Sequence, residues 1–567
     1  MIANPERLAL VGGAVLRPDD RRRAIVDRRS TAVLVEDGRI AAIGDDRTIL
    51  EHAGSRAEVL DVHGGVIAPG FVDAHIHAFD RALASLKVSC LPPGVDRLAA
   101  LTRRLHERVT HAAPTDWIVG QGYDDMRLAE RRHPTRRDLD QAVGERPAVV
   151  TRVCGHMSVA STTALRLAGI DEWTRDPAGG SIVRDAAGSP TGLLLESAQD
   201  LVLDLVPPPG IGEISRALRE TGRVLLGHGI TTICEALLGA FHPLEHEIWS
   251  RVLADGWVGP DVRFLAEPRV AETAMGAGLA VIGIKLFADG VITGRTAALS
   301  RPFAEGTDTG MLIHEPDALA GMVRRSIGMG LPVGIHAMGD RGIDVAIDAI
   351  EEVMGRHSSD GRPSRGPLAH PHRIEHCSIP SARSLERMRS LGIVPVPQPV
   401  FLFAEGEAYL AQLGRERTAG AYPLRTMIEL GLRPALSSDA PATSTEDAAN
   451  PWLGIAAAVT RRSWAGTELG SSERLSIEEA IALYTAGGAD VLRLADRVGS
   501  VDVGREADLV VYGDDPLAMS PNDLSAIVPE LVMAKGRIGH GNAAGGTASF
   551  SGRRGSPVRG LGPLPRW

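Results

Sequence analysis

Residues that can bind a metal ion stand at the ends of short apolar segments along this chain. The first are His75 and His77, which close the run that begins at Phe71. Residues i and i+2 of a strand point to the same face, so these two imidazoles could hold one metal ion. The pattern also fits two polar loop residues. An apolar strand that ends in Asp73, His75 and His77 is nevertheless a poor core element unless a site requires them.

Lys285 is the second candidate, because it lies within the apolar run 282–287. Burial of a lysine lowers its pKa. A neutral amine can react with carbon dioxide and form a carbamate, which would bridge two divalent cations as a carboxylate does. The alternative is an ordinary ion pair between Lys285 and Asp289, and the residue taken alone favours that alternative.

Three further residues of ligand type end predicted strands, namely His336, His376 and Asp439. Each one alone is more often a core or surface residue. Taken together with the two earlier candidates, five strands each deliver such a residue at the carboxyl end. Enzymes built on parallel barrels keep their active sites at that end, so the joint pattern predicts a metal site.

The elements that must position these residues are typical of an α/β fold. Short β-branched runs alternate with helical stretches, and the eight runs match the number of strands in a (β/α)8 TIM barrel. The predicted strands are 71–77, 231–235, 262–267, 281–287, 331–336, 372–377, 393–398 and 434–439. Apolar residues at helical spacing between Asp340 and Val353 predict one of the connecting helices.

The predicted barrel covers residues 69–494, with one long interruption. The gap between the first two strands far exceeds a normal βα connection, so residues 80–225 are predicted to form an inserted subdomain. Strand-and-turn patterns at 1–68 and 495–540 predict one small β-sandwich domain formed from both chain ends. The segment 541–567 is rich in Gly, Ser, Pro and Arg and is predicted to be disordered.

The order HxH, Lys, His, His, Asp resembles the amidohydrolase superfamily. The sequences of the motifs are most similar to those of its YtcJ-like branch, also called amidohydrolase 3, which includes N-substituted formamide deformylases. The matching segments are 68–77, 152–156, 190–192, 284–290, 336–340, 373–376, 438–441 and 504–511. These motifs are specific for the branch and not for a substrate. Two positions depart from it: Tyr123 stands where the branch usually has Trp, and Ser378 where it often has Gln.

The resemblance implies that six residues form the metal site: His75, His77, Lys285, His336, His376 and Asp439. The HxH pair would hold one ion together with Asp439, and the other two histidines would hold a second ion. Lys285 would bridge the two ions if carbamylated, and would stay unmodified if only one ion binds. Asp439 is also expected to be catalytic, as a general base and then a general acid.

Zinc is the metal expected at a site rich in histidine nitrogen, with one or two ions bound. Iron, manganese, nickel and cobalt remain alternatives, because ligand type alone does not select among them.

Residues outside the metal site receive roles from the same resemblance. His156, Tyr123 and Arg152 are expected to bind substrate, although His156 could equally be a loop histidine without a role. Independently of the resemblance, Asp340 and Glu375 adjoin ligands and are expected to orient them by accepting hydrogen bonds from their rings. Arg373 could instead pair with Glu375 structurally.

Composition limits the classes of partner. The net charge of -10 argues against a nucleic-acid partner, which would require a basic face. No apolar run is long enough to cross a bilayer, and the first residues lack a secretory pattern. The four cysteines form no CxxC motif, so a cytoplasmic protein is expected. A small-molecule substrate is the predicted partner, and association into a homo-oligomer is compatible with the sequence.

The function expected from these features is hydrolysis of a non-peptide C–N bond, in an amide, N-formyl or N-acyl compound, by a metal-activated water. One alternative is an isomerisation, decarboxylation or ring opening in the same barrel. Another is a non-catalytic binding protein that retains the fold, although the complete set of ligands argues against it.

Overall fold

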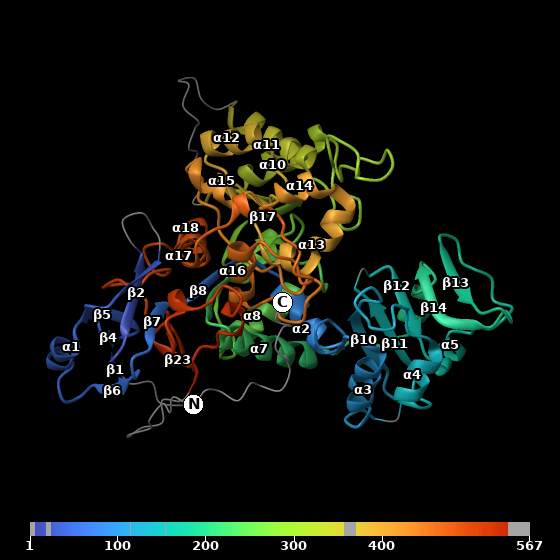
Figure 1. Ribbon diagram of the computed structural model, residues 1–567, viewed down its shortest axis with the longest axis horizontal. Coiled ribbons are helices and arrows are strands. Elements are labelled where there is room, and N and C mark those ends of the chain that lie inside the picture. Colours follow the sequence, from blue (N-terminus) through green and yellow to red (C-terminus); the bar gives the residue numbers. More distant parts are fainter. Residues whose placement is uncertain (1–5, 19–23, 114, 154, 356–369, 542–567) are drawn as a thin grey trace. The chain divides into compact units, whose positions relative to one another are not determined.

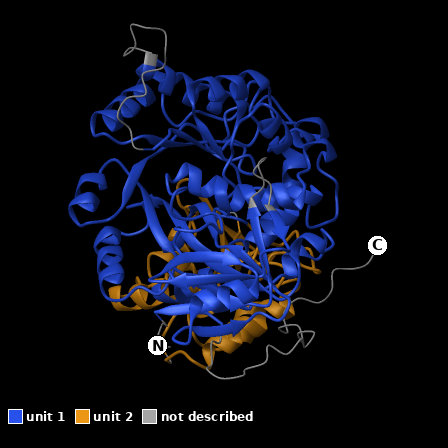
Figure 2. Ribbon diagram, turned by 90° about the vertical axis from the view of Figure 1, so that its left-hand side faces the viewer, with its two compact units in different colours: residues 1–79, 219–443, 448–552 blue, residues 80–218, 444–447, 553–567 orange. Residues whose placement is uncertain are grey.

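The computed structural model describes residues 6–18, 24–113, 115–153, 155–355 and 370–541. The chain divides into two compact units (Figure 2). Unit 1 comprises residues 1–79, 219–443 and 448–552, and unit 2 comprises residues 80–218, 444–447 and 553–567. Residues 542–567 of the tail predicted to be disordered, and Cys154 of the 152–156 motif, lie outside the described residues.

Seven parallel strands form the barrel of unit 1, in the order β20-β19-β18-β17-β16-β15-β8. Their bounds are β8 (Phe71–Ile76), β15 (Ile230–Leu238), β16 (Asp261–Ala266), β17 (Val281–Phe287), β18 (Val333–Ala337), β19 (Arg373–His376) and β20 (Val394–Val396). Every neighbouring pair is parallel. These strands agree with seven of the eight predicted ones to within a few residues, which confirms the α/β barrel.

The eighth predicted strand, 434–439, is not a regular strand. Its backbone still connects the two ends of the sheet, because the Ala435 amide donates to the Pro395 carbonyl at 3.2 Å and the Asp439 amide donates to the His75 carbonyl at 2.9 Å. Asp439 has a φ of 55°, which takes the chain out of the extended conformation at the predicted ligand. The barrel is therefore closed by an irregular segment.

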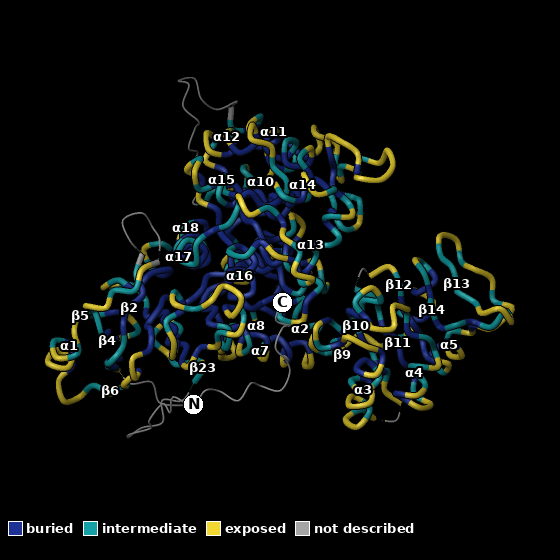
Figure 3. The backbone as a smooth tube through the Cα atoms, in the orientation of Figure 1, coloured by how far each residue is buried: buried dark blue, intermediate teal, exposed yellow. Residues whose placement is uncertain are grey.

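Helices follow the barrel strands and cover the sheet. They are α7 (Ile211–Gly227), α8 (Glu245–Ala254), α9 (Ala271–Gly276), α10 (Pro316–Gly328), α11 (Asp340–Gly355), α12 (Ala382–Leu391), α13 (Val400–Leu413), α14 (Arg415–Ala419), α15 (Leu424–Glu429), α16 (Pro451–Thr460), α17 (Ile477–Ala482) and α18 (Gly488–Val491). Figure 3 shows the central strands as buried and the helices with alternating buried and exposed stretches. Ile343, Ile347 and Ile350 of α11 are fully buried, as their helical spacing predicts.

Two further sheets in unit 1 combine both ends of the chain. One sheet contains β5 (Arg39–Gly44), β4 (Ala32–Glu36), β1 (Arg7–Val11) and β6 (Glu58–Asp61). The other contains β23 (Arg537–His540), β22 (Leu531–Ala534), β21 (Leu509–Tyr512), β7 (Val66–Pro69), β2 (Ala14–Pro18) and β3 (Ala24–Asp27). The antiparallel pairing of β21 with β7 joins the ends, and Figure 1 shows the blue N-terminal strands beside the red β23. Leu10 and Val35 of one sheet share a core with Ile67, Leu509 and Met533 of the other, so the small β-sandwich is confirmed.

Unit 2 is built on a mixed six-stranded sheet in the order β13-β14-β12-β11-β10-β9. The strands are β9 (Val88–Ser89), β10 (Ile118–Tyr123), β11 (Ala148–Arg152), β12 (Met157–Ala160), β13 (Gly180–Arg184) and β14 (Pro190–Glu196). Its helices include α3 (Leu98–Val109), α4 (Arg136–Val143), α5 (Thr162–Leu167) and α6 (Asp200–Leu203). The main segment of the unit ends at Leu218, within α7.

Two expectations from composition can be compared with this fold. Within the described ranges, no helix combines the length and apolarity needed to span a bilayer. Cys90, Cys234 and Cys377 are buried free thiols.

Candidate metal centre

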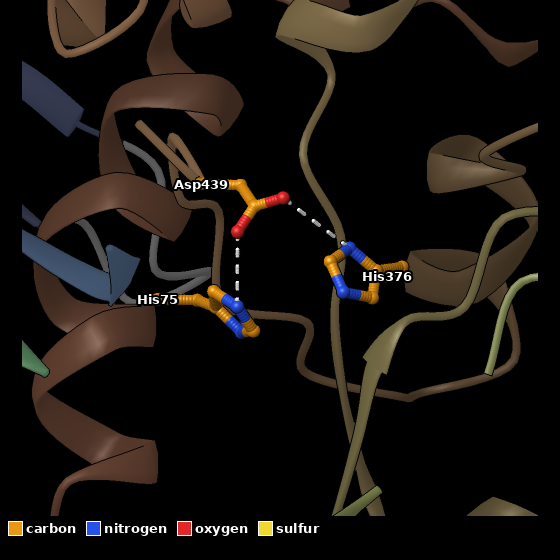
Figure 4. A group of neighbouring side chains, drawn as sticks. All are labelled: His75, His376 and Asp439. Carbon is orange, nitrogen blue, oxygen red and sulfur yellow. Dashed lines mark ion pairs between the residues drawn. The ribbon is translucent and has the colours of Figure 1, made fainter. Parts of the chain in front are cut away.

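The carboxyl ends of the barrel strands bring predicted ligands together inside unit 1. The ring centroids of His336 and His376 lie 4.3 Å apart, and those of His75 and His376 lie 5.0 Å apart. Figure 4 shows the carboxylate of Asp439 with one oxygen toward His75 and the other toward His376. The potential ligand atoms of His75, His376 and Asp439 all lie within 4.8 Å of one another.

One oxygen of Asp439 lies close to both histidines of the HxH pair. Asp439 Oδ1 lies 3.1 Å from Nε2 of His75 and 3.0 Å from Nε2 of His77. His75 Nε2 and Asp439 Oδ1 are nevertheless buried without a hydrogen-bond partner among the described residues. Buried polar atoms normally have a partner. Three ligand atoms that converge in this way, with two of them unsatisfied, fit the coordination of one divalent ion.

The opposite nitrogen of His75 is held by a buried carboxylate. Glu375 Oε2 lies 2.6 Å from His75 Nδ1, and Arg373 donates to both Glu375 oxygens at 2.7 and 2.8 Å. Burial would raise the pKa of Glu375, but Arg373 and His75 hold it well below its usual range. An anionic acceptor keeps the proton on Nδ1 and leaves the Nε2 lone pair for a metal.

His336 and His376 are fixed by neutral acceptors. The Gly290 carbonyl lies 3.0 Å from His336 Nε2, so Nδ1 of that ring is left as a ligand. Gln398 Oε1 lies 2.8 Å from His376 Nδ1, and the Gln398 amide donates to the Val396 carbonyl. Burial lowers the pKa of His336 to about 3, and it lowers that of His376 well below its usual value. Both rings are therefore neutral, which is the form that binds metals.

Lys285 is buried beside these rings without a described hydrogen bond or ion pair. Burial lowers its pKa to about 8, although the charges of Glu375 and Asp439 oppose this. The ion pair with Asp289, considered as an alternative, does not form. Asp289 instead accepts the backbone amides of Ala298, Met338 and Gly339 at 2.8–2.9 Å.

Two carboxylates lie behind His77. Glu235 Oε1 is 3.8 Å from His77 Nδ1, and Glu235 Oε2 accepts the Phe79 amide at 2.9 Å. Glu245 accepts the amides of Gly239 and Phe241, and the Phe241 ring packs 5.6 Å from that of His77. Burial lowers the pKa of His77, but the neighbouring carboxylates of Asp439 and Glu235 outweigh this effect and raise the pKa to about 9.

Sequence reasoning missed Glu235 and Gln398 as partners of the ligands. Each is the last residue of a predicted strand, 231–235 or 393–398. The rule that singled out the histidines at strand ends would have identified both, had it been applied to Glu and Gln.

Asp340, expected to orient a ligand, has a different partner in the structure. It begins α11 and accepts hydrogen bonds from the backbone amide and the hydroxyl of Ser300. The ring of His336 uses the Gly290 carbonyl instead.

The three residues expected to bind substrate belong to unit 2, whereas the ligands belong to unit 1. Tyr123 is buried, and its hydroxyl lies 3.1 Å from His133 Nδ1. Arg152 pairs with Asp124 and Asp125. His156 is exposed, and its Nδ1 lies 2.9 Å from Glu196. Their role in substrate binding stays a prediction.

Known proteins resemble the chain over nearly its whole length. The family model described as "Amidohydrolase family" matches residues 58–540. YtcJ of Bacillus subtilis, whose name describes an amidohydrolase, is 30% identical over 543 residues, which cover 90% of this chain and 96% of YtcJ. The N-substituted formamide deformylase of Arthrobacter pascens is 28% identical, over 88% of this chain and 93% of that protein.

A solved structure has the same architecture. A metal-dependent hydrolase from Pyrococcus furiosus, described as uncharacterized, is 26% identical and superposes with a TM-score of 0.69. The match covers 90% of this chain and all of that one.

Proposed function

This chain belongs to the amidohydrolase family of metal-dependent hydrolases, and on that premise we propose that it cleaves a non-peptide C–N bond. The substrate would be an amide, an N-formyl or an N-acyl compound. The observation that carries the proposal is the convergence of His75 Nε2, His77 Nε2 and Asp439 Oδ1, two of them buried without a hydrogen-bond partner among the described residues. Similarity to the formamide deformylase supports the choice of bond.

A divalent ion held by the HxH pair and Asp439 would acidify a water molecule and polarise the scissile carbonyl. Zinc fits this donor set of two imidazoles and one carboxylate. A second ion would be held by His336 and His376, whose free ring nitrogens are set by Gly290 and Gln398.

Asp439 is the residue that moves the proton in this proposal. Burial would raise its pKa, but the surrounding histidines hold the value well below the usual range. The carboxylate accepts a proton from the attacking water and passes it to the leaving nitrogen, so that a carboxylic acid and an amine are released. Its second oxygen, Oδ2, lies 3.9 Å from His376 Nδ1, toward the other half of the centre.

Lys285 would serve as the bridge of a two-ion centre. Its neutral Nζ would attack carbon dioxide and form an N–C bond, while the electron pair of one C–O π bond moves to that oxygen. The nitrogen would lose a proton to water, which gives an anionic carbamate. Within the described residues the amine forms no ion pair. It lies near the charges of Glu375 and Asp439, and two cations would compensate these charges together with that of the carbamate. In a one-ion centre Lys285 stays an amine.

A substrate screen tests the reaction. Protein loaded with zinc, manganese or cobalt would be assayed with N-formyl, N-acyl and cyclic amides, and release of the amine would be measured. We expect a chelator to abolish turnover and added metal to restore it. The variant Asp439→Asn should show no turnover. Turnover that persists without metal, or release of a product without incorporation of water, would contradict the proposal.

A further inference from the structure

Helix α13, which follows β20, directs one face toward the metal centre. Phe401, Glu405 and Tyr409 are spaced four residues apart on this helix, so they lie on the same face. The Phe401 ring is 6.2 Å from the ring of His376. One turn of helix therefore separates Glu405 from a residue that touches a proposed ligand.

The C-terminal end of this helix face is connected by hydrogen bonds to the segment that follows β19. The hydroxyl of Tyr409 lies 3.1 Å from that of Tyr422, which accepts a hydrogen bond from Ser378 at 2.9 Å. Ser378 follows His376 by two residues. On this helix face Glu405 therefore lies between Phe401, which packs against His376, and Tyr409, which contacts Tyr422.

The electrostatics agree with this placement. Burial and the charge of Asp439 raise the pKa of Glu405 to about 8. The charge of Glu405 in turn contributes to the raised pKa values of Tyr409 and Tyr422. Glu405 is half-buried, and it has no hydrogen bond or ion pair within the described part of the chain.

Three aromatic side chains pack against the ligand rings. Phe241 packs against His77, Phe287 against His336 and Phe401 against His376. A partly buried carboxylate in such surroundings costs free energy unless a partner compensates its charge. Aromatic faces also attract cations. A positively charged substrate would compensate the charge of the carboxylate and would also be attracted by the aromatic rings.

We propose that Glu405 is a specificity-determining residue that binds a cationic nitrogen, an ammonium or guanidinium, on the substrate. The inference rests on the proposed function and narrows it to N-acyl or N-formyl compounds with a second, positively charged nitrogen on an apolar chain. Glu405 contacts that remote group and takes no part in breaking the C–N bond.

Matched substrates separate charge from size. N-formyl-1,4-diaminobutane carries an ammonium, N-formylpentylamine replaces it with a methyl group, and an N-formylamino acid of equal length carries a carboxylate. The wild-type kcat/KM should be at least about tenfold higher for the ammonium compound than for the methyl compound, as a charge-assisted hydrogen bond implies. In Glu405→Gln this ratio should fall by about tenfold or more, and Glu405→Lys should favour the carboxylate compound.

Glu407→Gln is the matched control, because Glu407 lies on the same helix and bonds to Ser463 instead. The ratio should keep its wild-type value in this variant. Equal wild-type kcat/KM values for the ammonium and methyl compounds would overturn the inference, and so would a preference that Glu405→Gln leaves intact.

Equilibrium binding distinguishes this inference from the proposed function. Calorimetry would compare butylammonium with butanol on metal-loaded wild-type protein and on Glu405→Gln. Selective binding of the cation that Glu405→Gln removes supports the inference even if no amide is hydrolysed. Hydrolysis of amides together with equal binding of the two probes would refute it and leave the proposed function standing.

Discussion

Three of the four proposed ligand imidazoles engage a protein partner through one ring nitrogen and leave the other for an ion. The partners are the Glu375 carboxylate for His75, the Gln398 amide for His376 and the Gly290 carbonyl for His336. Such contacts fix the tautomer and the ring orientation before an ion arrives. The proposed metal centre would therefore be prepared by residues that are not ligands themselves.

Removal of either HxH imidazole should abolish both metal binding and turnover. In His75→Ala and His77→Ala we expect the first ion to be lost while the fold is retained, because the coordinating nitrogens converge on Asp439 and not on the apolar core. Elemental analysis, melting temperature and turnover of the same preparations check this. Near-full turnover with normal metal content in either variant would refute the assignment.

Glu235→Gln should weaken metal binding by about 10–100-fold, the usual cost of losing a partner behind a metal ligand. The amide keeps an acceptor for the Phe79 backbone but removes the charge that supports His77. A competitive chelator titration measures the affinity. Glu245→Gln is the control, since Glu245 accepts the backbone amides of Gly239 and Phe241. Equal losses of metal affinity in both variants would speak against a specific role for Glu235.

Lys285→Ala should lose activity and bind less of the second ion. A short carboxylic acid such as acetate should partly restore both, because it can take the place of the carbamate between two cations. Metal content and turnover with and without acetate measure the effect. A density map of metal-loaded wild-type protein with a bare amine at Lys285 would point to the one-ion arrangement.

At the scale of single residues, the strand-end pattern identified side chains that do gather at one place, such as His75, His376 and Asp439. Their positions followed from the period of the strands and the polarity of parallel sheets. Glu405 could not be found in this way, since its relation to Asp439 depends on how α13 lies against the barrel.

Among the elements, strands that are buried on both faces were predictable from their apolar runs, as β17 illustrates with bounds identical to the predicted ones. The segment 434–439 has a similar run but no regular ladder, and it ends at Asp439, which adopts a left-handed conformation. His376 also has a positive φ, of 66°. Departures from regular strands thus occur at proposed ligands, where local pattern is a poor guide.

Arg461, which follows α16, should be a major stabilising residue of the helical layer. It is fully buried, and its guanidinium donates to the backbone carbonyls of Ala419, Ala421, Tyr422, Leu469 and Gly470. Arg461→Met removes these buried hydrogen bonds and should cost about 3 kcal/mol or more. The urea midpoint should fall accordingly. The exposed Arg433→Met should change stability by no more than about 0.5 kcal/mol, and similar midpoints for both variants would contradict this account.

Across the whole molecule, the C-terminal strands complete a sheet begun near the N-terminus, and Asp508 stands at that junction. Its backbone carbonyl accepts the Gly70 amide, and its buried carboxyl accepts the Lys535 amide at 2.6 Å. Unit 2, by contrast, interrupts the barrel after β8 with its own sheet and cores. Its existence followed from the length of the gap, but its mixed sheet is set by long-range pairing that local patterns do not encode.

Asp508 should make stability depend on pH. Burial raises its pKa from 3.8 to about 6, so the folded protein retains a proton that the unfolded chain releases. Its stabilising contribution is fully present below pH 3.8 and is lost as the pH rises through about 6, by up to about 3 kcal/mol. Asp508→Asn does not titrate, so its melting temperature relative to wild type should rise between pH 4 and about 6 and then level off. A difference that is constant from pH 4 to 8 would contradict this assignment.

The metal centre itself is tested most directly by an anomalous difference map from crystals of zinc-loaded protein. We predict a peak within about 2.0–2.2 Å of His75 Nε2, His77 Nε2 and an oxygen of Asp439. A second peak at His336 and His376 would identify the two-ion form. The absence of any peak at these side chains, in a preparation that hydrolyses an amide, would contradict the account.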